Sequence, residues 1–180
     1  MSRLFLIRHA EPALKGVILG AADVPLSERG HEQAGELAIG FDDLDSVVAI
    51  YASPLRRTLQ TAAYLLEPWR AFASMDDLRE ISYGPWDGLT WDEIASREPD
   101  LAERKLADWL GVDVPGGEQW GEFEARVAHA LALILKGPLP AAIVAHEGVN
   151  SHIARLLGGT DETEFRQDYC EILSYAASSD

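Results

Sequence analysis

Three short apolar segments of the chain end in residues that suit anion binding. The run Leu4–Ile7 leads into Arg8 and His9, residues 46–52 lead into a segment containing Arg57, and residues 141–145 lead into His146. Ligands of open α/β sheets bind outside the carboxyl ends of the strands. We therefore expect the two arginines and two histidines to converge on one crevice, although they are far apart in the sequence.

The chemistry that fits two arginines and two imidazoles around one point is phosphoryl transfer. Arginine forks place donors on non-bridging phosphoryl oxygens and offset the charge that grows during transfer. A neutral histidine attacks phosphorus through one ring nitrogen while the other donates to a backbone carbonyl. The leaving alkoxide needs a proton, and Glu80, which follows a predicted short strand, is the best candidate acid. The candidate catalytic residues are Arg8, His9, Arg57, Glu80 and His146.

Each of these features has a plainer interpretation when taken alone. An Arg-His pair at a strand end is more often a surface feature, and Glu80 alone could be a surface carboxylate. We interpret His31 and His129 as structural residues of helices, and leave His152 open between a structural and a functional role. The tryptophans at 86, 91, 109 and 120 are interpreted mainly as packing anchors.

The elements that must position these residues alternate between strands and helices. Continuous apolar runs predict buried strands at 3–8, 46–52 and 141–145, with weaker strands near 70–74 and 171–175. Apolar spacing and capping residues predict helices at about 27–39, 54–66, 119–135 and 149–157. This order is typical of a three-layer α/β/α sandwich with a mostly parallel central sheet.

The segment between the predicted acid and the third core strand differs from the rest of the chain. Residues 90–110 look helical, are interrupted by Pro99, and are rich in tryptophan and charge. We predict that residues of about 85–118 form a lid or insertion within a single domain covering 1–180.

Composition excludes several classes of partner. The formal net charge of −15 disfavours nucleic acid and anionic membrane. No stretch is apolar for long enough to cross a bilayer, and the N-terminal apolar run is too short for a secretory signal. With a single cysteine, Cys170, which we interpret as a small core residue, we expect a cytoplasmic protein. A homodimer formed through a sheet edge near the C-terminus is compatible with the sequence.

We also expect neither a metal ion nor a cofactor. The sequence contains no His-x-x-x-His pair, no cysteine cluster and no calcium-loop aspartate triplet. Its glycines form no dinucleotide-binding or phosphate-loop fingerprint.

Six blocks, taken in order along the chain, carry a family resemblance. Leu6-Ile7-Arg8-His9-Ala10-Glu11 resembles the Arg-His-Gly motif of the histidine phosphatase superfamily, in its phosphoglycerate mutase-like branch. The other blocks are 23–30 (DVPLSERG), 53–61 (SPLRRTLQT), 80–84 (EISYG) followed by Gly88, 115–118 (PGGE) and 144–146 (VAH). Each block alone is weak, but the ordered series is specific, and it is most like the small phosphatases of the family.

The resemblance implies a role for each of the five candidate residues. His9 would be the nucleophile that becomes phosphorylated, and Glu80 the proton donor. Arg8, Arg57 and His146 would bind the phosphoryl oxygens. We further expect Glu147, Gly20 and Tyr83 to bind the substrate.

The chain departs from the family pattern at three places. Ala10 replaces the usual glycine, and the mutase Trp-Asn pair is missing after Glu11. Glu147 stands where this branch usually has glycine, whereas the acid phosphatase branch has a proton-donating carboxylate there. Glu147 would then share the acid role, or repel substrates with a second anionic group, or simply be a solvated carboxylate.

The resemblance favours hydrolysis over phosphate transfer between substrates. The chain is shorter than the mutases, mostly between Glu80 and His146, and a shorter cover would let water reach a phosphorylated His9. We therefore predict a metal-independent phosphomonoesterase that acts on a small phosphorylated metabolite. The alternatives are a cofactor-dependent phosphoglycerate mutase-type phosphotransferase and a non-catalytic phosphate-binding protein.

Overall fold

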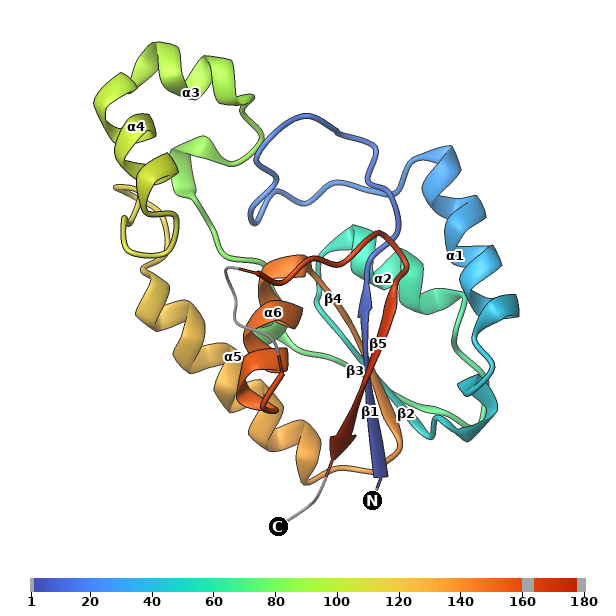
Figure 1. The fold of residues 1–180 in the computed structure, drawn as a ribbon. Helices are drawn as coiled ribbons and strands as arrows, with labels where there is room; N and C mark the ends of the chain where they lie inside the picture. Colours follow the sequence, from blue (N-terminus) through green and yellow to red (C-terminus); the bar gives the residue numbers. More distant parts are fainter. Residues whose placement is uncertain (1, 160–163, 178–180) are drawn as a thin grey trace.

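The centre of the molecule is a mostly parallel sheet (Figure 1). The computed structural model describes residues 2–159 and 164–177, and within them the sheet has five strands in the order β3-β2-β4-β1-β5. The parallel strands are β1 (Ser2–Arg8), β2 (Ala49–Ala52), β3 (Ala71–Ser74) and β4 (Ala141–Ala145). The edge strand β5 (Ile172–Ala177) runs antiparallel to β1.

Helices cover both faces of this sheet, so the predicted three-layer fold is confirmed. Successive strand residues point to opposite faces. Phe5 and Ile7 pack toward α1 (Glu28–Gly40) and α2 (Arg56–Ala63), whereas Leu4 and Leu6 pack toward α5 (Trp120–Leu135) and α6 (Glu147–Leu156). Burial on both faces explains why the central strands are continuous apolar runs.

Most element ends follow local signals, but α2 begins two residues later than predicted. Ser27 begins α1 as expected, because its Oγ accepts a hydrogen bond from Gly30 N at 2.9 Å. Pro54 does not open α2. Ser53 Oγ accepts from Leu55 N, and Asp23 Oδ1 accepts from Arg56 N at 2.6 Å. Side chains therefore satisfy these backbone donors before the helix starts at Arg56.

Other boundaries also differ from the expected ones, and α2 ends at Ala63 instead of at about residue 66. The strand predicted at 46–52 is only Ala49–Ala52, because the 3-10 helix η1 (Leu44–Ser46) precedes it. Helix α6 starts at Glu147, with only His146 between it and the end of β4, instead of at 149. This early start places Glu147 in the first turn of α6, next to the strand end.

The predicted insertion contains two short helices that lie beyond the sheet (Figure 1). Helix α3 (Trp91–Arg97) begins in a capping box at Thr90, and α4 (Pro99–Ala107) begins at the predicted proline break. Two 3-10 helices, η2 (Asp76–Leu78) and η3 (Gly84–Trp86), lead into them. The segment has its own small core around Trp86, Ile94, Ala102 and Val114. That it acts as a lid stays a prediction.

The residues interpreted as structural have partners within the fold. The ring of His31 contacts the Tyr64 hydroxyl, and His129 Nδ1 lies 2.8 Å from an oxygen of Asp77. Cys170 is half-buried and packs against apolar side chains of the sheet and α1. No helix within residues 2–159 and 164–177 is both long and apolar enough to cross a membrane.

The hydrogen bonds of Arg70 are expected to stabilise the edge of the sheet that is formed by β3. Its guanidinium is buried and donates to the carbonyls of three residues, which are Leu44, Val47 and Leu65. Arg70→Met leaves these carbonyls without their donor, so we expect the free energy of unfolding to fall by roughly 2–3 kcal/mol in urea denaturation. Arg29→Met, at an exposed arginine of α1, is the matched control and should change it little. Equal losses in both variants would contradict this account.

Candidate active site

The carboxyl ends of three strands bring the predicted site residues together. Arg8 pairs with Ala145 in the β1–β4 register, and Ala52 with Val144 in the β2–β4 register. The residues that directly follow these strands therefore meet at one edge. The rings of His9 and His146 lie there with their centroids 5.2 Å apart.

The contacts of His9 fix the tautomer of its imidazole. Nδ1 lies 2.7 Å from the carbonyl oxygen of Ala10, and Nε2 lies 3.3 Å from Nε of Arg57. A carbonyl only accepts and a guanidinium only donates, so Nδ1 carries the proton and Nε2 holds a lone pair. Burial, together with the charge of Arg57, lowers the pKa of His9 to about 3. His9 is therefore neutral at physiological pH and has the form required of a nucleophile.

Arg57, in the first turn of α2, also holds the loop that follows β1. Its Nη1 donates to Ala22 O at 2.6 Å and its Nη2 to Gly20 O at 2.9 Å. Asp87 secures the same loop by accepting from Ala21 N. A Cβ at Gly20 would come within 1.8 Å of an Asp87 oxygen, and φ there is +47°, so this position favours glycine.

Arg8 lies at the opposite side of His9 with part of its guanidinium unpaired. Its Nη1 donates to Gln167 O at 2.5 Å and lies 3.0 Å from Glu147 Oε2, and its Cζ lies 4.5 Å from the centre of the Tyr169 ring. The Nε is buried and has no hydrogen-bond partner within the described part of the chain. Such a donor next to a cavity suits an anionic ligand oxygen.

His146 completes this cluster of groups. Its Nε2 is 2.9 Å from Ser53 Oγ, while its Nδ1 is buried and unpaired among residues 2–159 and 164–177. Burial, followed by the nearby charge of Arg57, holds the pKa of His146 well below its usual value. His146 is therefore an uncharged imidazole with one unpartnered ring nitrogen among the described residues.

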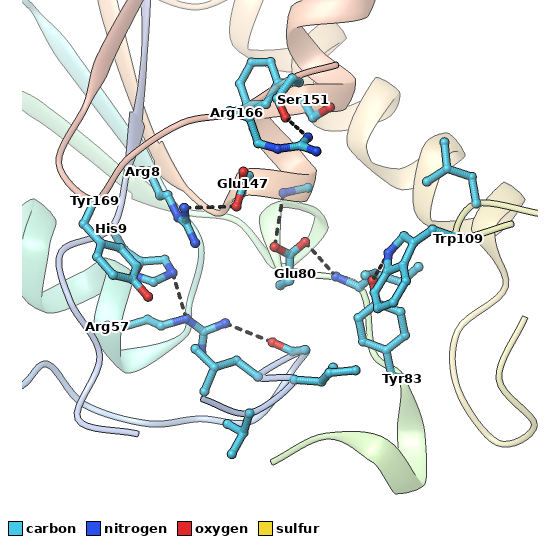
Figure 2. Close-up of a pocket in the computed structure, with 18 of the residues that line it drawn as sticks. Arg8, His9, Arg57, Glu80, Tyr83, Trp109, Glu147, Ser151, Arg166 and Tyr169 are labelled. Carbon is cyan, nitrogen blue, oxygen red and sulfur yellow. Dashed lines mark hydrogen bonds and ion pairs between the residues drawn. The ribbon is translucent and has the colours of Figure 1, made fainter. Parts of the chain in front are cut away.

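Glu80 faces the same cavity from the other side, as Figure 2 shows. Its carboxylate accepts from Ile81 N at 3.1 Å and from Gly148 N, at the start of α6, at 3.2 Å. Burial raises the pKa of Glu80, although these two hydrogen bonds and Arg57 oppose the shift. A carboxyl with a raised pKa is suited to give a proton to a leaving group.

A partly buried arginine positions the segment that carries Glu80. Arg126 of α5 donates to the carbonyls of Asp77, Arg79 and Glu80 at 2.7–3.3 Å. Its Nε and Nη2 also pair with both carboxylate oxygens of Glu118, at 2.5 and 2.8 Å. Glu118 was within a recognised sequence block, but nothing in the sequence marked Arg126.

Seven of the eight residues predicted to act or bind at the site line one cavity. The cavity measures about 380 Å³. Its predicted lining residues are Arg8, His9, Gly20, Arg57, Glu80, Tyr83 and Glu147. His146 lies behind them, against the His9 ring. His152, which the sequence left open, is buried beside Phe123 and Glu124 of α5 and does not line the cavity.

Sequence reasoning missed several residues of this cavity. Tyr169 lies with its ring centre 5.6 Å from that of His9 and also packs on Arg8. Gln167 orients Arg8, and its side chain donates to Leu6 O and Glu171 O. Other lining residues that were not expected at the site are Val17, Ile18, Leu19, Ile81, Trp109, Leu110, Trp120, Gly148, Ser151, Phe165 and Arg166. Residues 164–171 carry no regular apolar period, so no signal pointed to them.

Comparison with known proteins supports the family resemblance. The family model of the histidine phosphatase superfamily (branch 1) matches residues 4–178. Phosphoserine phosphatase 1 of Hydrogenobacter thermophilus is 31% identical over 183 residues, which cover 98% of this chain and 85% of that protein. A bifunctional protein of Mycobacterium tuberculosis is 32% identical over 139 residues, which cover 76% of this chain. That alignment spans only 38% of the mycobacterial protein's length.

Solved structures with the same fold also carry phosphatase names. The α-ribazole phosphatase of Shigella flexneri superposes with a TM-score of 0.85 at 30% identity, covering 96% of this chain and 89% of that one. A putative α-ribazole-5′-P phosphatase of Escherichia coli gives a TM-score of 0.84 at 28% identity, covering 96% and 89%. Because the family model matches nearly the whole chain, this protein belongs to the histidine phosphatase superfamily, branch 1.

Proposed function

We propose that the protein is a metal-independent phosphomonoesterase that hydrolyses a small phosphorylated metabolite through a phosphohistidine on His9. The observation that carries the proposal is the pairing of His9 with Glu80 across one cavity. The Nε2 lone pair of His9 is available beside the guanidinium of Arg57, and burial raises the pKa of Glu80. A neutral nucleophile and a carboxyl group suited to be an acid, both beside positively charged side chains in one cavity, fit the hydrolysis of a phosphate ester.

The first step transfers the phosphoryl group to the enzyme. His9 Nε2 attacks phosphorus, the bond from phosphorus to the ester oxygen breaks, and Glu80 gives its proton to the departing alcohol. Arg8, Arg57 and His146 hold the non-bridging oxygens and offset their charge. The Nε atom of Arg57 that donates to His9 in the free enzyme then turns to a phosphoryl oxygen.

The second step returns the enzyme to its starting state. Glu80, now a carboxylate, accepts a proton from a water molecule as that water attacks the phosphohistidine. The bond between Nε2 and phosphorus breaks, inorganic phosphate leaves, and His9 is again neutral with a free lone pair. Because Glu80 regains its proton in this step, the cycle closes without a metal ion or another acid.

Glu147 is better suited to selecting substrates than to sharing the acid role. Its Oε2 is 3.0 Å from Arg8 Nη1, so it is engaged with a cation of the phosphate cluster. A second anionic group on a substrate would meet this carboxylate at the edge of the cavity. This arrangement supports the repulsion hypothesis over a purely solvated carboxylate.

Hydrolysis is favoured over phosphate transfer between substrates. The relatives compared above carry the names of phosphoserine and α-ribazole phosphatases, and none of these names describes a mutase. A mutase-type transferase and a non-catalytic phosphate-binding protein are therefore treated as outcomes of the tests. The cytoplasmic location, the lack of nucleic-acid and membrane partners, and the homodimer stay predictions.

The first test measures turnover of p-nitrophenyl phosphate and small phosphomonoesters in the presence of EDTA. We expect EDTA to leave turnover unchanged and His9→Asn to lower it by at least about 10³-fold, because the nucleophile is lost. His31→Asn, outside the cavity, is the matched control and should keep wild-type activity.

Two results would contradict the proposed function. Loss of turnover with EDTA would remove metal independence, and full activity of His9→Asn would remove the phosphohistidine. If no ester is hydrolysed, a 3-phosphoglycerate isomerisation assay separates a mutase from a binding protein.

The acid role of Glu80 predicts a dependence on the leaving group. An alkoxide needs a proton as it departs, whereas p-nitrophenolate does not. Glu80→Gln should therefore lower kcat/KM, which reports the step in which the leaving group departs, by about 10²–10⁴-fold for an alkyl phosphate and far less for p-nitrophenyl phosphate. Equal losses on both esters would exclude Glu80 as the proton donor.

The same role sets the sign of the pH dependence. The acid must be protonated, so the rate on alkyl phosphates should fall as pH rises through the raised pKa of Glu80. His9 stays neutral down to a pH of about 3, so its protonation limits the rate only in strong acid. This fall should disappear in Glu80→Gln and remain in Glu147→Gln when kcat/KM, which reports the phosphorylation step, is measured against pH. Its loss in Glu147→Gln would assign the acid role to Glu147.

Arg126 is predicted to act as a positioning residue through its contacts with the Glu80 segment. Arg126→Met removes donors to the carbonyls of residues 77, 79 and 80, so we expect Glu80 to be misplaced. The variant should lower kcat/KM on alkyl phosphates by about tenfold or more, with a smaller loss on p-nitrophenyl phosphate. A uniform loss on both esters, with altered circular dichroism, would indicate a merely structural role.

A further inference from the structure

The cavity has two chemically different ends. Arg8, His9 and Arg57 supply the cationic end, where the phosphoryl group would bind. Away from it, Figure 2 shows Tyr83 and Trp109 on the opposite side of the cavity. We call the apolar lining at this end the leaving-group wall, which consists of Val17, Ile18, Leu19, Tyr83, Trp109 and Leu110.

The aromatic part of the leaving-group wall is held in place by its own hydrogen bonds. Trp109 Nε1 donates to the Tyr83 hydroxyl oxygen at 3.2 Å, and the two rings meet edge to face with centroids 5.8 Å apart. This bond uses the only donor of the indole side chain. What Trp109 offers to a ligand is therefore its apolar ring surface.

A buried lysine fixes the backbone that carries Trp109. The side chain of Lys105 is only 3% exposed, and its ammonium donates to Trp109 O and to Val112 O. The same nitrogen lies 5.2 Å from the centre of the Trp109 ring and 5.4 Å from that of Tyr83. Burying an ammonium group is costly unless its hydrogen-bond acceptors are well placed. The acceptors of Lys105 are in place without a ligand, which indicates that the wall is formed before a ligand binds.

The aliphatic part of the leaving-group wall is tied to the same region of the chain. Ile18 N donates to Leu89 O at 2.9 Å, and Gly88 N donates to Ile18 O at 2.7 Å. Ile18 also packs against the small core around Trp86. The loop after β1 and the 85–118 segment therefore present one continuous apolar surface.

The size of the cavity exceeds what a phosphoryl group with a short polar tail would fill. Its volume of about 380 Å³ lies within the range of ~300–1,000 Å³ that is typical of sites for drug-sized ligands. All six members of the leaving-group wall are at least partly exposed to solvent in the free protein. Covering them with an apolar group releases that surface from water, which stabilises the complex.

We propose that the substrate is a phosphomonoester whose alcohol carries a bulky, uncharged apolar body, either aromatic or branched alkyl, that packs on the leaving-group wall. This inference rests on the proposed hydrolysis at His9 and adds the substrate class. Ser151 and Arg166 also line the cavity, so the inference concerns the part of the alcohol that reaches the leaving-group wall. There the polar groups of a polyol, a sugar or a phosphorylated carboxylic acid would face apolar surface without partners. A second anion would in addition meet Glu147 beside Arg8.

The test compares esters of primary alcohols, so that leaving-group chemistry stays similar. In wild-type protein we expect kcat/KM for 3-phenylpropyl phosphate to exceed that for glycerol 3-phosphate, O-phosphoserine and 3-phosphoglycerate by about tenfold or more. In Trp109→Ala this preference should fall by about tenfold, equivalent to ~1.4 kcal/mol. Trp109→Phe, which restores an apolar ring, should recover most of it.

Trp69→Ala provides the matched control for the same chemical change. Trp69 is exposed, packs over Arg70 and does not line the cavity, so its loss should leave the preference unchanged. Hydrolysis of the polar esters with equal or better kcat/KM, or an unchanged preference in Trp109→Ala, overturns the substrate class while the proposed hydrolysis stands. Absence of His9-dependent turnover on every ester, p-nitrophenyl phosphate included, overturns both.

Discussion

The buried guanidinium of Arg57 is the constraint on which the rest of the site depends. A charge taken out of water must find acceptors, and Arg57 finds them in His9 Nε2 and in the carbonyls of Gly20 and Ala22. One side chain thereby fixes the tautomer of the nucleophile and the course of the loop after β1. It also keeps a positive charge where a phosphoryl group would bind. The function of the site therefore explains why a charge is buried here despite the loss of its hydration.

The acid side of the site is also held by an arginine that donates to backbone carbonyls. Arg126 donates to successive carbonyls of the segment that carries Glu80, and Glu118 holds its guanidinium in turn. The two arginines come from helices on opposite faces of the sheet, α2 and α5. The two networks are joined through Asp87, which accepts from Ala21 N in the loop held by Arg57 and from Ser82 Oγ and Tyr83 N in the segment after Glu80. The positions of the nucleophile and the acid are therefore coupled by hydrogen bonds within the folded chain.

The features of the fold and the site that could be predicted are those marked by a pattern of neighbouring residues in the sequence. The central strands were predictable because burial on both faces requires unbroken apolar runs, and the residues after β1, β2 and β4 followed from that. Arg126, Gln167 and Tyr169 were not predictable, because they act through backbone carbonyls or ring contacts made only in the folded chain. The start of α2 was wrong for a similar reason, since the distant Asp23 accepts from its first backbone amide.

The central claim is that phosphate passes through His9. It is tested most directly by mixing the protein rapidly with p-nitrophenyl phosphate, quenching in alkali, which preserves phosphohistidine, and mapping the modified peptide by mass spectrometry. The account predicts a burst of nitrophenolate close to one per enzyme molecule, and one phosphoryl group on His9 that is lost in acid. Steady turnover with no phosphorylated peptide, or a phosphoryl group on His146 or another residue, would contradict it.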